Sequence, residues 1–259
     1  MPVIATTVAA PAFAVSKPKC GGVEAPTYTM YFGDQPLSTN QSGTVFNATM
    51  DTIQPAGLSV DLTGVSVTSS GTISVRSTGL GLNAKVVSSA ANWGGGLYPA
   101  NTGYFALDQG GTRTNNDGSL RGFQTAVFTF NQTLYNVQVT VIDIDSQYDT
   151  ASDKYADQVQ VTGSTGTTST ATVANSTYLV GAGTNTVGVN PSQYATATNP
   201  DAIGFGSTKG NATFTISGGT TTITVKYSNK QTGNGTGANT GAQQIYLAPF
   251  TFSLVDCVP

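Results

Sequence analysis

Apolar and hydroxyl-bearing residues alternate with a period of two along most of this chain. Residues 136–145 read NVQVTVIDID, and residues 212–217 read ATFTIS in the same way. Successive side chains of a β-strand point to opposite faces of its sheet, so the alternation predicts strands with one apolar face. The pattern recurs in residues 27–32, 43–50, 58–70, 72–77, 125–130, 157–163, 221–228 and 245–255. Helical periodicity is almost absent, and the sequence therefore predicts an all-β protein.

Turn-forming residues separate these runs and divide the chain into many short strands. Residues 116–118 (Asn-Asp-Gly) and 217–219 (Ser-Gly-Gly) are typical of tight connections. Such a pattern predicts antiparallel sheets packed face to face, as in a jelly-roll-like β-sandwich. No linker divides the sequence, so we expect a single domain over residues 15–259. Long loops, which often carry the binding function of such scaffolds, are expected at residues 90–122, 182–204 and 229–243.

The first residues of the chain predict export. Residues 1–14 form a short apolar run ending in Ala12-Phe13-Ala14, which fits the small-x-small pattern of signal peptidase cleavage. The run resembles the tails of exported actinobacterial signal peptides, so we interpret it as a signal-peptide remnant before a mature start at Val15. An apolar first strand is the alternative, although two prolines and the lack of alternation argue against it. A secreted or cell-surface location follows, and the charged fraction of only 9% is in keeping with it.

Two cysteines and the weak charge narrow the class of protein further. Cys20 and Cys257 lie near opposite ends of the predicted mature chain, and an exported protein with an even cysteine count usually forms disulfides. We therefore predict one Cys20–Cys257 disulfide, with two free thiols as the alternative. The net charge of −3 and the scattered basic residues offer no basic patch, so a nucleic-acid partner is not expected. No apolar run beyond residue 14 is long enough for membrane insertion.

Acidic residues are concentrated in one short segment. Of the 13 acidic residues, five lie between positions 143 and 157, namely Asp143, Asp145, Asp149, Asp153 and Asp157. The first two would emerge side by side at the end of one strand, where they repel each other unless a positive charge intervenes. The last opens the next strand, and the other two lie in the connection. Calcium prefers such a set of oxygen ligands, so the segment predicts a calcium site.

The spacing of these aspartates differs from that of an EF-hand, which needs a D-x-D-x-D-G sequence and a late Glu. A solvated acidic loop, partly balanced by Lys154, is the alternative to a calcium site.

A family resemblance rests on the same segment. Residues 128–161 read FTFNQTLYNVQVTVIDIDSQYDTASDKYADQVQV, which resembles the F-x-F…N-V-x-V-x-V-x-D-I-D…D-x-V-x-V segment of exported bacterial adhesin domains. The nearest family is the lectin-like second non-repetitive domain of the CshA-type surface adhesins. The resemblance implies a β-sandwich that attaches to host or matrix ligands, and position by position it covers Asp143, Asp145 and Asp157.

Catalysis is not expected from this composition, whereas ligand binding is. The chain has no His, which excludes a Ser-His-Asp triad and a Cys-His pair, and Glu24 is its single glutamate. The only tryptophan, Trp93, lies in ANWGGGLYP with Tyr98 nearby, and such aromatic rings stack on sugar rings in carbohydrate-binding modules. The alternative is that Trp93 closes one end of the core.

The sequence therefore predicts a secreted, calcium-stabilised surface adhesin or carbohydrate-binding module. Its partner would be an extracellular glycan or a host or matrix protein. The alternative is a structural surface protein, an S-layer or fibre subunit that self-associates through its Thr- and Gly-rich sheets.

Overall fold

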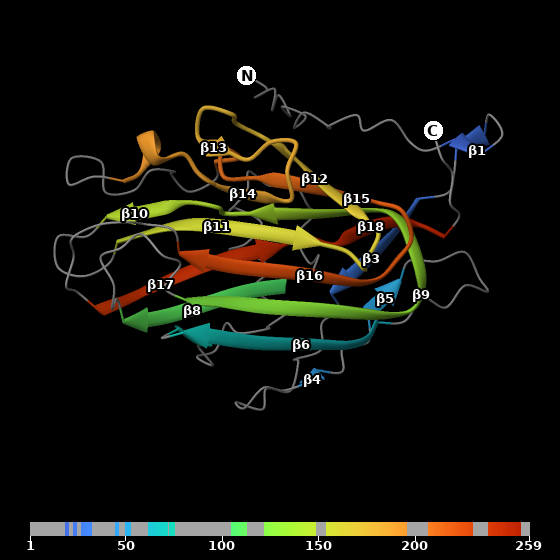
Figure 1. The fold of residues 1–259 in the computed structure, drawn as a ribbon, viewed down its shortest axis with the longest axis horizontal. Coiled ribbons are helices and arrows are strands. Elements are labelled where there is room, and N and C mark those ends of the chain that lie inside the picture. Colours follow the sequence, from blue (N-terminus) through green and yellow to red (C-terminus); the bar gives the residue numbers. More distant parts are fainter. Residues whose placement is uncertain are drawn as a thin grey trace, which may run out of the picture.

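The computed structural model describes residues 19–20, 23–24, 27–32, 45–46, 50–52, 62–71, 73–75, 105–112, 122–148, 154–195, 207–229 and 238–254. Within these ranges the secondary structure is antiparallel strands and one short 3-10 helix, η2 (Pro191–Gln193). The strands form a curled, sandwich-like arrangement (Figure 1). The predicted all-β, antiparallel fold class is therefore confirmed.

One long strand, β9 (Gly122–Ile142), joins the two halves of this arrangement. Figure 1 shows β9 running along one layer, bending at one end of the molecule and returning in the other layer. Its first half, residues 122–130, pairs with β6 (Leu62–Gly71) and β16 (Thr220–Asn229). Its second half, residues 135–142, pairs with β15 (Ala212–Ser217), β17 (Ala238–Leu247) and β18 (Phe250–Ser253).

The first half of β9 belongs to what we call the first sheet, whose strand order is β13-β14-β11-β16-β9-β6-β4. Its further members are β4 (Val45–Phe46), β11 (Lys154–Thr162), β13 (Leu179–Val180) and β14 (Thr186–Val189). A short strand, β10 (Ser146–Tyr148), pairs with the start of β11 as a hairpin. In the sequence, the connection between these two strands lies between Asp145 and Asp157 of the predicted calcium site.

The second half of β9 belongs to the second sheet, in which β15 lies on one side of β9 and β17 and β18 follow one another on the other side. Its further members are β3 (Tyr28–Phe32), β5 (Met50–Thr52), β7 (Ile73–Val75), β8 (Phe105–Thr112) and β12 (Thr168–Val173). The strands β1 (Lys19–Cys20) and β2 (Val23–Glu24) pair only with each other within the described residues.

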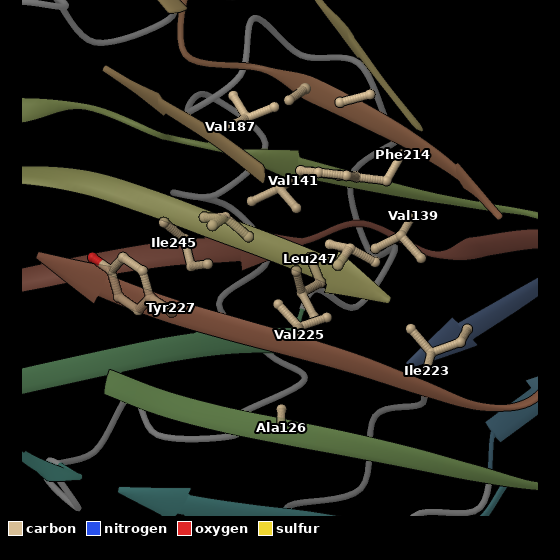
Figure 2. Close-up of a cluster of buried hydrophobic side chains, with 14 of the residues drawn as sticks. Ala126, Val139, Val141, Val187, Phe214, Ile223, Val225, Tyr227, Ile245 and Leu247 are labelled. Atoms are coloured by element: carbon tan, nitrogen blue, oxygen red, sulfur yellow. The ribbon is translucent and has the colours of Figure 1, made fainter. Parts of the chain in front are cut away.

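The apolar faces of the two sheets meet in one core. Phe128 of the first sheet makes edge-on contacts with Phe105 and Phe250 of the second, at centroid distances of 5.0 and 5.1 Å. Contacts of this geometry contribute about 0.5–1.5 kcal/mol each beyond the area they bury. Val139 and Val141 of β9 are fully buried in the same core, which confirms the predicted alternation over residues 136–141. Figure 2 shows this packing, with side chains of several strands converging on one interior.

Three segments that the sequence predicts as long loops contain strands instead. The strand β8 lies inside the predicted loop 90–122, and its Phe105 and Leu107 are buried. The strand β14 lies inside the predicted loop 182–204, and β17 begins inside residues 229–243. Glycine, threonine and asparagine interrupt the apolar alternation in these segments, so the sequence pattern does not show the strands. These segments form strands because they pair with neighbouring strands, and not because of the intrinsic propensity of their residues.

Several predicted features lie outside the described residues. They are the signal-peptide remnant at residues 1–14, Trp93, Tyr98 and Cys257. Cys20 lies in β1, so the predicted disulfide stays a prediction, as does the single domain over residues 15–259. In the part of the chain that the structure describes, no helix has the length and apolar character that a membrane span needs.

Candidate functional site

The aspartates at the end of β9 lie where the strand stops, not within it. The sequence predicts one strand through Asp145, but β9 ends at Ile142 and Asp143 has a left-handed backbone with φ of 69°. This conformation is rare for residues other than Gly, although Asp and Asn adopt it more readily than most. The strand ends there, and Ile142 and Ile144 are both buried beside the core. Asp143 and Asp145 are also buried.

Asp145 and Asp157 are brought together, as the sequence predicts. The backbone N–H of Asp157 donates to the carbonyl of Asp145 at 2.8 Å. The backbone N–H of Asp145 donates in turn to the carboxylate Oδ2 of Asp157 at 3.2 Å. Asp157 has no exposed surface, so this carboxylate is held inside the protein by the chain segment that carries the other two aspartates.

A tyrosine from a distant strand holds the second oxygen of the same carboxylate. The hydroxyl of Tyr227 in β16 donates to Oδ1 of Asp157 at 2.8 Å. Figure 2 shows the Tyr227 ring next to Val225, with its hydroxyl oxygen pointing away from the other labelled side chains of β16. Burial, followed by the charge of Asp157, raises the pKa of Tyr227 well above its ordinary value of 10. Tyr227 therefore stays protonated and remains a hydrogen-bond donor at neutral pH.

Two further tyrosines complete what we call the aspartate–tyrosine cluster, consisting of Asp143, Asp145, Asp157, Tyr155, Tyr178 and Tyr227. Burial and the charges of Asp145, Asp157 and Asp143, in that order, raise the pKa of Tyr155 well above 10, and Tyr155 hydrogen-bonds to the carboxylate of Asp145. Burial, and then the charge of Asp145, also raises the pKa of Tyr178. The charges of the three aspartates thus together raise the pKa values of this small group of buried tyrosines.

Tyr178 is placed in the cluster by a turn that Asn175 organises. The side chain of Asn175 accepts hydrogen bonds from the backbone N–H groups of Thr177 and Tyr178 at 3.0 and 2.9 Å. The backbone N–H of Asn190 donates to the carbonyl of Tyr178 at 2.8 Å. Such side-chain bonds to nearby backbone groups fix a turn without a sheet or helix, so the position of the phenol ring is set by the chain around it.

The hydroxyl of Tyr178 is buried next to Ser146. Tyr178 is 4% exposed. Hydrogen bonding by the side chain and backbone of Ser146 lowers the pKa of Tyr178, but burial and the charge of Asp145 outweigh this effect. The Ser146 hydroxyl oxygen also accepts from the backbone N–H of Ala195 at 3.0 Å.

The structure describes only part of the predicted calcium site. Asp149 and Asp153 lie outside the described residues. Over the residues that are described, no three side chains of the metal-ligating kinds lie close enough together to hold an ion. Calcium takes six to eight oxygen ligands, so an ion here would need carbonyl groups, water or the two remaining aspartates besides the carboxylates of the cluster.

In charge and in donor type, though not in the number of side chains gathered, the cluster resembles a site for a hard cation. Three carboxylates lie within electrostatic reach of the Tyr155 hydroxyl, and carboxylate oxygen is the ligand that calcium prefers. A cation bound here would offset their mutual repulsion in a buried setting where charges are weakly screened.

Sequence reasoning missed the tyrosines. Tyr155 could have been found, because it lies two residues before Asp157 on the same strand and therefore on the same face. Tyr227 is brought in by the pairing of β16 with β11 and Tyr178 by the turn that Asn175 organises before β13, and no local pattern in the sequence points to either.

The fold and the cluster together define an all-β, sandwich-like protein with buried carboxylates at one strand end. Comparison with protein-family models, with curated proteins and with solved structures finds no match to this chain.

Proposed function

We propose that this protein acts outside the cell as a calcium-stabilised surface adhesin or carbohydrate-binding module. The observation that carries the proposal is the aspartate–tyrosine cluster, which gathers three carboxylates at the point where β9, β10 and β11 meet. A cation that links these segments would stabilise the end of the sandwich from which their connections leave. Binding surfaces of β-sandwiches are commonly built from such connections.

Calcium is the cation that this setting favours. The donor atoms that the aspartates of the cluster offer are carboxylate oxygens, which suit calcium better than softer metals. The chain has no His, and extracellular calcium sites work at concentrations near the millimolar range. The apolar run at residues 1–14, which the sequence predicts to be a signal-peptide remnant, and the charged fraction of 9% support this extracellular setting.

Trp93 and Tyr98 are the proposed ligand contacts. Aromatic rings contribute large apolar areas at low conformational cost, and they suit the apolar face of a sugar ring. Trp93→Ala should abolish glycan binding with little change in melting temperature, and Trp93→Phe should retain part of it. A large loss of stability with binding intact would instead show that Trp93 belongs to the core.

Binding assays with and without calcium test the proposal. The purified protein is applied to a glycan array and to immobilised matrix proteins, in millimolar calcium and in chelator, next to Asp145→Asn as a calcium-insensitive control. We expect saturable binding that is stronger in calcium for the unsubstituted protein alone. Assembly into sheets or filaments on adding calcium, with no binding to any array, would favour the structural surface protein instead.

A further inference from the structure

One edge of the second sheet is covered by a turn instead of a strand. Among the described strands, β12 pairs with β15 alone. On its other side, the backbone N–H of Ala171 donates to the carbonyl of Thr184 at 2.8 Å, and the backbone N–H of Gly183 donates to the carbonyl of Ala171 at 2.8 Å. Residues 181–184, which we call the edge cover, thus take the place of a neighbouring strand at the centre of β12.

The edge cover reaches β12 from the first sheet. It connects β13 with β14, and β14 pairs with β11. Directly after the cover, the carbonyl of Asn185 accepts a hydrogen bond from the backbone N–H of Val161 in β11 at 2.9 Å. Figure 1 shows β13 and β14 close to β12. The same short connection therefore bonds to one strand of each sheet and joins the two sheets at this side of the sandwich.

The shape of the edge cover depends on Thr184. Its backbone N–H donates to the carbonyl of Gly181 at 3.0 Å. Its hydroxyl oxygen lies 2.8 Å from the carbonyl oxygens of both Gly181 and Thr186 and accepts from the backbone N–H of Thr186 at 3.2 Å. Thr184 is exposed, so a substitution that removes only this hydroxyl changes the turn and leaves the core intact.

The strand under the cover has none of the other features that protect a sheet edge. An open edge is a template for pairing with another chain, and proteins protect it with charged residues, proline, a bulge or a covering segment. The strand β12 reads TSTATV, without a charged residue or a proline, and Thr168, Thr170 and Thr172 are exposed. Its register with β15 runs without a bulge. Of these protections, the described residues give β12 only the edge cover.

The edge of β12 is complementary to itself. Alternate residues of an antiparallel strand direct their N–H and C=O groups to the same side, so Ser169 and Val173 present theirs on the side of Ala171. Two copies of β12 can pair in antiparallel fashion around Ala171, with Ser169 of one copy opposite Val173 of the other. Such a contact uses the same surface on both copies, and it therefore closes as a symmetric dimer.

We propose that the edge cover prevents β12 from pairing with β12 of a second copy of this chain, and that opening the cover produces a dimer through this edge. The partner is a second copy because the uncharged, self-complementary backbone row of β12 supplies both sides of the contact. This inference depends neither on calcium nor on the proposed ligand contacts. Its test is therefore carried out in chelator and without a ligand.

Two variants of the full chain open the cover in different ways. Thr184→Val removes the hydroxyl that shapes the turn and keeps a branched side chain of similar size. Gly183→Pro removes the N–H that bonds to Ala171, and proline cannot adopt the φ of 78° found at this position. Thr177→Val, at an exposed threonine before β13, is the matched control. Circular dichroism checks folding, and Thr184→Val decides alone if Gly183→Pro does not fold.

Sedimentation velocity over a range of protein concentrations measures the mass in solution, and hydrogen exchange in dilute samples measures the protection of the Ala171 amide. Both variants should exchange this amide faster than the unsubstituted protein does, because its acceptor in the cover is displaced. With rising concentration, both should shift toward twice the mass of the unsubstituted protein. Thr177→Val should show neither change.

Added charges on β12 locate the contact. Antiparallel pairing around Ala171 places position 170 of each copy opposite position 172 of the other, and like charges directly opposite destabilise a strand pair. Thr170→Lys combined with Thr172→Lys should therefore return both cover variants to the mass of the unsubstituted protein. Ser176→Lys combined with Ser192→Lys adds the same charge at exposed positions outside β12 and should leave the dimer intact.

Three results would overturn the inference. The first is faster exchange at Ala171 with no gain in mass at high concentration, because an open edge would then recruit no second copy. The second is an Ala171 amide that stays equally protected in every folded cover variant, because these contacts would then not cover the edge. The third is a dimer that persists with lysines at positions 170 and 172, because the contact would then lie outside β12.

Discussion

Two hydrogen bonds join Asp145 and Asp157. The backbone N–H of Asp157 donates to the carbonyl of Asp145 at 2.8 Å, and the backbone N–H of Asp145 donates to the carboxylate of Asp157 at 3.2 Å. The contact fixes the start of β10 against β11 with protein groups alone. For the proposed calcium site, two of the three clustered aspartates would therefore be in place before an ion arrives. Such preorganisation lowers the cost of binding, because fewer groups must be ordered when the ligand arrives.

The first prediction concerns the stability that Asp157 supplies. Asp157→Ala leaves the Tyr227 hydroxyl and the Asp145 N–H without their acceptor, so the free energy of unfolding in chelator should fall by about 2–3 kcal/mol. Asp157→Asn keeps one acceptor oxygen and should cost less. Urea unfolding followed by circular dichroism measures both. An Asp157→Ala variant as stable as the unsubstituted protein would mean that charge repulsion in the cluster cancels these two hydrogen bonds.

The second prediction is a loss of stability at alkaline pH. The pKa values of Tyr155, Tyr178 and Tyr227 are raised above 10 in the folded protein, while the unfolded chain keeps the ordinary value. Below pH 10 both states hold these protons, so the stability is complete. Above pH 10 the unfolded state loses them first, and each tyrosine lowers the free energy of unfolding by up to about 1.4 kcal/mol per pH unit.

Denaturant unfolding at a series of pH values from about 9 to about 11 measures this slope. Tyr227→Phe should make it shallower by the share of one tyrosine. Stability that stays constant across this range would contradict the burial of these phenols.

The third prediction concerns the turn before β12. The hydroxyl oxygen of Ser164 accepts from the backbone N–H groups of Thr221 and Thr222 at 3.0 and 3.2 Å, and from the hydroxyl of Thr220 at 3.0 Å. Ser164→Ala removes the acceptor of the Thr221 and Thr222 N–H groups at the irregular start of β16, while the Thr220 hydroxyl keeps the carbonyl of Thr222 as an acceptor at 2.6 Å. The free energy of unfolding should fall by about 1–2 kcal/mol.

The exposed neighbour Thr165 provides the control for this change. Thr165→Ala should leave the free energy of unfolding nearly unchanged, as surface substitutions usually do. Equal effects of the two alanines in thermal unfolding would argue against a structural role for the Ser164 hydroxyl.

The fourth prediction compares two glycines in the turn between β13 and β14. Gly181 and Gly183 both have positive φ, of 106° and 78°. A Cβ at Gly181 would lie 2.0 Å from the carbonyl oxygen of Thr186, whereas one at Gly183 would meet nothing within 4 Å. Gly183→Ala should cost about 1–2 kcal/mol for the backbone conformation alone, and Gly181→Ala should cost clearly more. Thermal unfolding of the two variants measures both losses of stability, and equal losses would contradict the close approach at Gly181.

The strand pattern could be predicted from the sequence where apolar residues alternate without interruption. Val137, Val139 and Val141 are buried as the alternation requires. The prediction failed at Asp143, whose left-handed backbone ends β9, because alternation alone cannot show where a strand stops. It failed also at β8, where Phe105 and Leu107 are buried among glycine and polar residues that read as a loop.

Only the aspartates of the aspartate–tyrosine cluster could be predicted from the sequence. Asp145 and Asp157 flank one hairpin, so their proximity follows from local sequence. The contact between Tyr227 and Asp157 joins residues 70 positions apart, and it depends on the pairing of β11 with β16. That pairing is chosen by the packing of the whole core, and no short segment of sequence encodes it.

Because β9 belongs to both sheets, we expect the two sheets to unfold together. Residues 122–130 of one strand lie in the first sheet and residues 135–142 lie in the second, so neither sheet can detach while the other stays intact. Local openings that would otherwise be confined to one layer are coupled along the continuous backbone. Amide hydrogens of Val127 and Val139 should therefore exchange with solvent only when the whole protein unfolds. A mechanical force applied to one sheet should likewise be transmitted through β9 to the other.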